Sequence, residues 1–537
     1  EYDREELERA DAKLSPTARE TMYQQKFHLY RNLTKPSERL YLSFAKAGAS
    51  GEAQNPSYLI NEIRKLFPEI PVRDIEKEEK PEEKLEMPRS GEALFLEELG
   101  RAAEGEIDPL FEELYRWYAA HPEAGIPAET YRKAAFLRCA DGVIGKSAAS
   151  ALYGDTLKNS ATRLEKYAAC AFAHFMEFGL QIRERDQYEL KAADMGTVMH
   201  EALEKFSKKL QENGETWKTV TDDTRDRLIE ECVEETMADY GNTIFQSSSR
   251  NQYRIIRVKR ILKRTVWALQ QQIRQGEFEP GEFEVSFSME DSLSAINIDL
   301  SEHEKMRLRG RIDRVDLCET DDKVYVKIID YKTGNTSLDL VALYYGLQLQ
   351  QAVYLDAAVE LEQKKHPGKQ VEPAGVFYYH IDDPMLDQEE DETDEAWGRR
   401  MLKALRMDGL VNADRKVVEL LDRVLEDGTT SDVIPVGKKK DGSYTSYSKV
   451  ASPEQFEVIR TYTRKKVREI GEGIFSGNVK ISPYQRDGAT ACAYCEYQGI
   501  CGFDQKIQGY EYRKLKGMDT ELLMKAMQEI TQSDQKE

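Results

Sequence analysis

The sequence predicts an α/β protein whose main unit is a mixed sheet flanked by helices, preceded by a smaller α/β unit and a helical layer. From about residue 158, helical patterns are followed by three β-rich runs, a helix and a further β-rich run. This order is typical of a sheet with helices packed on its faces. Upstream, residues 1–70 read as helix, strand and helix, and residues 93–155 carry helical periodicity.

Composition limits the class of protein. The chain has 537 residues, enough for several domains, and its net charge of −21 excludes a uniformly basic surface for nucleic acid. Any DNA contact must therefore use local basic patches. No uncharged apolar run of about 18 residues predicts a membrane span. The charged start lacks a secretory signal, and its first residue, Glu1, suggests a fragment or processed chain. Seven cysteines, an odd number, fit a reducing cytoplasm.

Four segments are expected along the chain. Residues 1–73 contain a predicted strand at 39–47, and residues 74–157 hold a charged linker followed by the helical layer. Residues 158–515 form the main unit, in which 387–397 is an acidic insertion, and 516–537 is a polar tail that is helical or frayed. Residues 140–147, ADGVIGKS, end like a phosphate-binding loop. The motif's first glycine is Ala140 and the preceding residues look helical, so we expect no ATP site, and Gly145 to end a helix.

The strongest chemical signal is the stretch RGRIDRVDLCETDDKVYVKIIDYKTG at residues 309–334. Two β-rich runs around a polar turn at 319–322 predict a hairpin. Alternation places Asp330 and Lys332 on one face, with Asp313 diagonally across at roughly 7–8 Å. Carboxylates at that spacing can share one Mg²⁺, and a lysine beside the ion can orient a water molecule and help to deprotonate it. The alternative is a pair of exposed acids with a salt-bridged lysine, which the apolar surroundings of Asp330 disfavour.

This hairpin resembles the core of PD-(D/E)XK nucleases of the RecB type, which have a restriction-endonuclease-like fold. That family also carries Gly-x-x-x-His upstream and Gln-x-x-x-Tyr downstream, matched here by GTVMH at 196–200 and QQAVY at 350–354. The resemblance implies that His200, Asp313 and Asp330 bind Mg²⁺, with the backbone carbonyl of Tyr331 as a further ligand.

The same resemblance implies that Lys332 is the catalytic lysine, alongside Asp313 and Asp330, and that Gln350 and Tyr354 position the DNA backbone. Glu284 is a weaker match that adds an acidic group near the site. The implied reaction is phosphodiester hydrolysis assisted by one or two metal ions.

Three cysteines near the end of the chain, Cys492, Cys495 and Cys501, have the spacing C-x2-C-x5-C. A tetrahedral site needs a fourth ligand, for which Cys170 is the candidate. Four thiolates suit either zinc or an iron–sulfur cluster. The other cysteines have no partner in spacing and are expected to be packing thiols: Cys139, Cys232 and Cys318.

The cysteine arrangement resembles the AddB family, which belongs to the bacterial AddAB-type ATP-dependent helicase–deoxyribonucleases. The resemblance covers residues from about 20 to 510, including SATRLEKYAACAFAHF and ISPYQRDGATACAYCEYQGICGF. It implies a [4Fe–4S] cluster on Cys170, Cys492, Cys495 and Cys501. It also implies an exonuclease that processes double-strand DNA ends for recombinational repair, in a heterodimer with an AddA-type helicase–nuclease subunit.

The amino-terminal part would then be the end of a helicase-like motor domain. Lys35 and Arg39 are present in LYRNLTKPSERLYLSFAKA, but no convincing arginine finger is. This departure agrees with a family in which the motor fold of AddB is thought not to drive translocation.

Basic residues gather between 250 and 264 with no acid among them, and most fall on one side of a predicted helix. Arg254 and Arg257 are the candidates for tracking a single DNA strand fed from a duplex end. The alternative is a solvated or acid-docking helix face. Two further patches are 438–440 and 460–468.

Two other functions remain open from sequence. One is a non-catalytic iron–sulfur or zinc scaffold that binds DNA or a partner. The other is a Cas4-type nuclease, which shares the core and a four-cysteine cluster, although the motor-like segment and the size of the chain argue against it.

Overall fold

The chain divides into two compact units, Glu1–Arg132 and Lys133–Glu537, which are described separately. The computed structural model describes these residues: 16–48, 52–74, 85, 91–103, 105, 109–137, 142–185, 187–240, 244–287, 293, 297–301, 304–387 and 392–533. Most of the predicted charged linker, part of the acidic insertion at 387–397, and Cys139 lie outside them. Among the described residues, no helix combines the length and apolar character that crossing a membrane requires.

The first unit begins with two helices, α2 (Ala18–Thr34) and α3 (Tyr58–Leu66), neither of which buries a residue. The strand predicted at 39–47 is wrong, because the backbone there forms only an isolated bridge between Ala47 and Ala53. Tyr41 in this segment is exposed. An apolar run becomes a strand only when another strand pairs with its backbone, and the described residues of this unit supply none.

The predicted helical layer is present. It consists of α4 (Gly91–Ala103), α5 (Pro109–Ala120), the short η2 (Pro122–Ala124) and α6 (Ala128–Ala135). Phe95 of α4 is fully buried and packs on Tyr118 of α5, with ring centroids 5.1 Å apart.

The second unit contains the predicted mixed sheet. Its six strands, in spatial order, are β2 (Glu279–Phe287), β5 (Gly310–Glu319), β6 (Lys323–Lys332), β7 (Gln370–His380), β8 (Asp408–Asn412) and β9 (Val450–Ala451). The β6/β7 and β8/β9 pairs are parallel, and the other neighbours are antiparallel.

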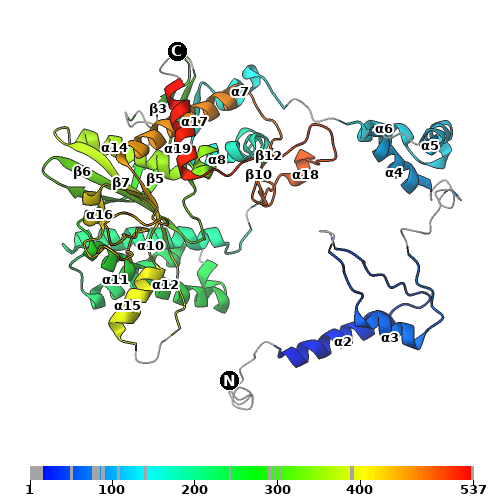
Figure 1. Cartoon of the computed structure of the whole chain (residues 1–537), viewed down its shortest axis with the longest axis horizontal. Helices are drawn as coiled ribbons and strands as arrows, with labels where there is room; N and C mark the ends of the chain where they lie inside the picture. The colour runs from blue at the N-terminus through cyan, green and yellow to red at the C-terminus, as the bar shows by residue number, and fades with distance from the viewer. Residues whose placement is uncertain are drawn as a thin grey trace. The chain divides into compact units, whose positions relative to one another are not determined.

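Helices cover both faces of this sheet and create two apolar cores (Figure 1). One core is closed by α10 (Ala192–Glu212), α11 (Asp222–Asp239), α12 (Ser249–Gln275), α15 (Asp394–Ala404) and α16 (Arg415–Leu421). The other is closed by α8 (Ala161–Ala169), α13 (Leu340–Tyr344), α14 (Gln350–Lys365), α17 (Pro453–Phe475) and α19 (Thr520–Ser533). The predicted polar tail therefore contributes a packed helix, because α19 buries Leu523 and Met527.

Smaller elements complete the unit. They are α7 (Lys146–Tyr153), β1 (Thr156–Asn159), α9 (Ala171–His174), the π-helical η3 (Phe175–Gly179), η4 (Ile244–Gln246), β3 (Asn297–Asp299), β4 (Lys305–Leu308), β10 (Tyr484–Arg486), β11 (Ala489–Thr490), α18 (Gln498–Cys501) and β12 (Arg513–Lys514). The single strand expected before the hairpin is split at Arg309, whose N–H donates to the carbonyl of Asn159 at 2.9 Å. Gly145 begins α7 rather than ending a helix, and its φ of 81° is one that glycine adopts readily.

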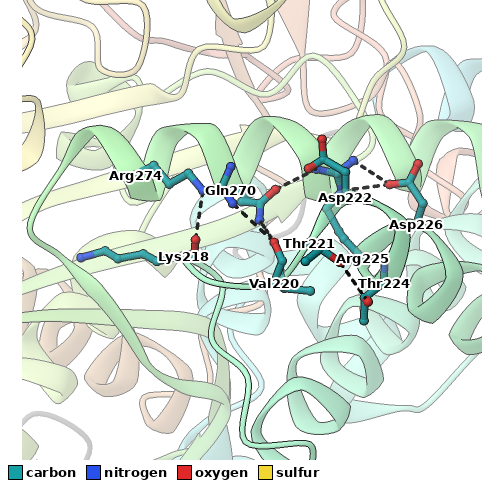
Figure 2. A network of polar contacts seen from close by, with 9 residues as sticks. All are labelled: Lys218, Val220, Thr221, Asp222, Thr224, Arg225, Asp226, Gln270 and Arg274. Atoms are coloured by element: carbon teal, nitrogen blue, oxygen red, sulfur yellow. Dashed lines mark hydrogen bonds and ion pairs between the residues drawn. The ribbon is translucent and has the colours of Figure 1, made fainter.

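A polar network fixes the start of α11 against α12 (Figure 2). The guanidinium of Arg225 donates to the Gln270 side chain and pairs with Asp222, both at 2.7 Å. The Gln270 amide in turn donates to the carbonyl of Val220 at 2.8 Å. Since Arg225 is 5% exposed, these partners satisfy a charge that would otherwise be costly to bury.

Candidate nuclease site and cysteine clasp

The hairpin that carries the predicted site is formed by β5 and β6. Its turn lies where the sequence predicts it, with the N–H of Thr320 donating to the carbonyl of Lys323 at 2.8 Å. Arg314 pairs with Ile329, so one further step of the register puts Asp313 directly opposite Asp330. The expected diagonal placement is wrong, because the turn is centred one residue later than expected. Directly opposed residues lie closer together, which brings the two carboxylates nearer.

Asp313 is held by two neighbours. The N–H of Tyr331 donates to its Oδ2 at 2.7 Å, and Nδ1 of His200, which α10 supplies, lies 3.3 Å from the same oxygen. The His200 ring also stands edge-on to Tyr331, with centroids 5.8 Å apart. The contact seen for the Tyr331 backbone is thus an N–H donated to Asp313, and metal binding by its carbonyl stays a prediction.

Asp330 and Lys332 end β6 on the same face, as alternation predicts. The ammonium of Lys332 lies 2.5 Å from Oδ2 of Asp330, whose residue is 2% exposed. The side-chain amide of Gln350 donates to Oδ1 of Asp330 at 2.8 Å, while its oxygen lies 3.5 Å from the Lys332 ammonium. Gln350 therefore orients both the acid and the lysine.

Tyr354 lies one helical turn beyond Gln350 and is 8% exposed. Its hydroxyl contacts the Gln350 side chain and the backbone N–H of Arg311, and its ring packs edge-on against Phe287 at 5.6 Å. Burial raises the pKa of this phenol to about 12, with the charge of Asp330 adding to the shift. Its observed role is therefore to support Gln350 and the start of β5.

Glu284 joins the site more closely than its weak sequence match suggested. Ligand atoms of His200, Glu284 and Asp313 all lie within 4.8 Å of one another, as a shared metal ion would require. Glu284 has φ of 50°, a strained conformation for a residue other than glycine. Arg311 pairs with its carboxylate. No sequence pattern reveals such a backbone conformation inside a strand.

The electrostatics of the site favour a bound cation. Burial raises the pKa of Asp330 to about 6 and that of Glu284 to about 7, and the charge of Asp313 raises both further. Burial alone would lower the pKa of His200, but its hydrogen bond to Asp313 and the surrounding acids outweigh this, so the pKa is raised. A divalent ion would offset this crowded negative charge, and carboxylate oxygens with one imidazole are suitable ligands for it.

A buried ion cluster supports the hairpin on the other face of the sheet. Asp316, fully buried, contacts the Arg314 guanidinium at 2.6 Å and the Lys327 ammonium at 2.9 Å. Arg314 also contacts the Tyr331 side chain. The cluster therefore holds the residue between Asp330 and Lys332. Single charges in a sequence do not reveal such pairing in the interior, so the sequence did not predict this cluster.

The structure brings the four predicted cysteines together, and we call Cys170, Cys492, Cys495 and Cys501 the cysteine clasp. Cys170 lies between α8 and α9 and packs with Tyr497 in a small apolar core, against which Cys495 also rests. Burial raises the pKa of the Cys492 thiol, and the other three thiols add to the shift. The N–H of Phe503 points to Sγ of Cys501 at 3.5 Å.

The other described cysteines behave as predicted. Cys232 and Cys318 are buried in the apolar core under α10, α11 and α12.

The basic patches are only partly available to DNA. On α12, Lys259 and Lys263 pair with acids of α11, and Arg260 lies 2.7 Å from Asp383. Within the described residues, Arg254 and Arg257 form no ion pair.

The other two patches are largely structural. Arg460 and Arg464 both bind the buried Asp356, and Lys438 is itself buried.

Comparison with known proteins agrees with this geometry. The sequence model of the PD-(D/E)XK nuclease superfamily matches residues 158–502. A relative from Lachnoclostridium phytofermentans is 42% identical over 95% of this chain and 44% of its own length. Relatives from Alkaliphilus metalliredigens and Clostridium tetani are 33% and 32% identical, each over 99% of this chain and 46% of their own length.

All three relatives are named as the second of the subunits of an ATP-dependent helicase/deoxyribonuclease, which confirms the predicted resemblance. The chain spans less than half of the length of these relatives. The superfamily match covers every predicted ligand and catalytic residue, from Cys170 and His200 to Cys501. The chain belongs to the PD-(D/E)XK nuclease superfamily.

Proposed function

We propose that the unit Lys133–Glu537 is a Mg²⁺-dependent deoxyribonuclease that hydrolyses phosphodiester bonds. The observation that carries this proposal is the convergence of His200, Glu284 and Asp313 within 4.8 Å, beside Asp330 and Lys332 at the end of the hairpin. A structural ion pair would need only one acid for Lys332, whereas here three acids and a histidine share one place. Such a cluster of ionisable groups with shifted pKa values is typical of an active site.

Each residue of the cluster would contribute differently to cleavage. Mg²⁺ held by His200, Asp313, Asp330 and Glu284 would polarise the scissile phosphate and stabilise the leaving oxygen. Lys332 presents ammonium protons beside Asp330, where they can orient a water molecule or a phosphate oxygen. Gln350 restrains Asp330 Oδ1 and so leaves Oδ2 facing Lys332.

We also propose that the complete protein is the AddB-type component of an ATP-dependent helicase–deoxyribonuclease. The names of the relatives support this role, although this chain spans only part of them. The protein would act as an exonuclease on single strands fed from double-strand DNA ends during recombinational repair, paired with an AddA-type subunit. Copurification of the full-length protein with such a motor subunit would support the heterodimer, and a fully active monomer would contradict it.

For the cysteine clasp we propose a [4Fe–4S] cluster. Thiolates around zinc at about 2.3 Å would lie roughly 3.8 Å apart. Among the described residues, no three of the clasp sulfur atoms lie within 4.8 Å of one another, a spacing better suited to thiolates on separate iron atoms. Anaerobically purified protein should be brown and contain about four iron atoms. Stoichiometric zinc without iron would overturn this proposal.

The nuclease is tested with Asp313→Ala. We expect Mg²⁺-dependent cleavage of labelled single-stranded DNA to fall on the order of a thousandfold, which is about 4 kcal/mol of barrier. DNA affinity measured in EDTA should stay unchanged. The matched control is Asp322→Ala, an exposed aspartate in the turn of the same hairpin. A wild-type protein that binds DNA without cleaving it would favour the scaffold function instead.

A further inference from the structure

A buried acid connects the two sites of the second unit. Glu165 lies on α8, five residues before Cys170, and its Oε1 accepts the backbone N–H groups of Leu349 at 2.6 Å and Gln350 at 2.9 Å. These are the first amides of α14, the helix whose first residue is Gln350. No part of the hairpin or of the cysteine motif includes Glu165, and neither site accounts for it.

The start of α14 lacks a capping side chain of its own. The residue before the helix, Leu349, has no side-chain oxygen, and it makes no side-chain capping bond. The first amides of a helix need acceptors, and a negative group placed there also complements the helix dipole. Glu165 supplies that acceptor from 184 positions earlier in the chain.

The next contacts lead directly into the nuclease site. The Gln350 side chain reaches Asp330 at 2.8 Å and Lys332 at 3.5 Å, so the position of the first turn of α14 sets the position of both. The charges of Lys332 and Asp330 also act on the Glu165 carboxyl. Burial raises the pKa of this carboxyl to about 7, while the two amide bonds oppose the shift.

The other end of α8 is fixed by the cysteine clasp. Cys170 closes the helix, with its N–H donated to the carbonyl of Lys166 at 3.0 Å. The Arg513 guanidinium, from the segment that follows the three late cysteines, donates to the carbonyls of Ala168 and Ala169. Leu164, next to Glu165, is fully buried, so α8 has little freedom to move independently of its ends.

We infer that Glu165 is a positioning residue through which the cysteine clasp holds Gln350 against Asp330 and Lys332. This inference rests on the proposed nuclease function. The clasp, α8, Glu165 and the first turn of α14 form one continuous series of contacts, and the cluster metal would thereby act on cleavage without touching DNA.

The test uses the full-length protein, purified anaerobically, with Glu165→Ala, Glu165→Gln and the control Glu177→Ala. Glu177 pairs with Lys166 of the same helix at 3.0 Å but is not bonded to α14. We expect Glu165→Ala to lower kcat about 10- to 100-fold, as loss of an orienting partner typically does, with KM for DNA and iron content unchanged. Glu165→Gln keeps an oxygen acceptor and should recover most of kcat, and Glu177→Ala should match the wild type.

A second readout is independent of activity. Hydrogen exchange at the Leu349 and Gln350 amides should speed up in Glu165→Ala and also in Cys501→Ser, which loses a cluster ligand. If the wild type does not cleave DNA, the proposed function fails while exchange still tests the contact. Wild-type kcat in Glu165→Ala, or failure of Glu165→Gln to recover activity, would overturn the role of Glu165. Unchanged exchange after loss of iron would overturn its link to the clasp.

Discussion

At the scale of single residues, Glu284 adds a third carboxylate to the site formed by Asp313 and Asp330. Its ligand oxygen lies within 4.8 Å of those of His200 and Asp313, and its raised pKa reflects burial and the nearby charge of Asp313. A metal ion would relieve both effects, so the strained backbone at this residue is consistent with a role in metal binding.

We expect Glu284→Gln to raise the Mg²⁺ concentration for half-maximal cleavage about 10- to 100-fold, because the amide keeps the shape of the side chain but loses its charge. Much of kcat should return at saturating Mg²⁺. The control is Glu282→Gln on the same strand, whose carboxylate pairs with Lys365 at 2.6 Å. A Mg²⁺ titration identical to that of the wild type would show that Glu284 is not a ligand.

His174 gives the second unit a pH-dependent stability. Its ring is 1% exposed among Tyr153, Tyr167 and Phe178, and its Nε2 has no hydrogen-bond partner. Burial, together with the charge of Arg163, lowers its pKa to about 3. Between pH 3 and 6.5 the unfolded chain therefore binds a proton that the folded chain does not, so stability falls as the pH falls.

Acidification from pH 7 to pH 5 should cost about 2 kcal/mol of unfolding free energy at His174 alone. His174→Phe, which fills an aromatic site without a titratable group, should lose this part of the pH dependence. Urea unfolding of both proteins at the two pH values measures it. An equal pH dependence in both would show that His174 is protonated in the folded protein.

At the scale of elements, α12 shows why a run of basic residues does not define a DNA-binding surface. Its seven basic positions within 250–264 are uninterrupted by acids in the sequence, yet α11 supplies acids to Lys259 and Lys263. The two helices are neighbours in the fold, which the linear sequence does not show. Arg254 and Arg257 are not paired within the described residues.

We therefore expect the double variant Arg254→Gln/Arg257→Gln to weaken single-stranded DNA binding and to reduce the slope of log Kd against log salt by about 1.4, or about 0.7 per contact. The control Lys259→Gln/Lys263→Gln removes equal charge from the same helix but from residues already paired. Anisotropy titrations across a salt series provide the measurement. Equal losses in both variants would indicate a general effect of charge.

The elements predicted correctly are those whose signal is local. The hairpin follows from two apolar runs around a polar turn, and the clasp follows from cysteine spacing. The predicted strand at 39–47 does not form because no partner strand lies among the described residues of its unit. The opposed rather than diagonal placement of Asp313, and the capping of α14 by Glu165, depend on contacts between distant segments. Such contacts leave no periodic pattern in the sequence.

At the scale of the whole molecule, the clasp joins Cys170 to a segment that ends at Cys501, so it encloses the entire nuclease core. Bringing distant parts of a chain together costs conformational entropy that grows slowly with the length of the loop, and metal–thiolate bonds can offset this cost. The clasp cysteines should therefore affect stability through the metal. A buried packing thiol such as Cys232 should affect it through the cavity that its removal leaves.

These two mechanisms predict different results for two cysteine variants. Cys495→Ala, at a partly exposed ligand, should lose iron and lower Tm, and reconstitution with iron and sulfide should not restore either. Cys232→Ala removes a fully buried sulfur atom and should cost about 1–2 kcal/mol while iron content stays at the wild-type level. Iron analysis combined with thermal unfolding under anaerobic conditions separates the two. If Cys495→Ala kept its iron, or Cys232→Ala lost it, the clasp would not be the structure that closes the nuclease core.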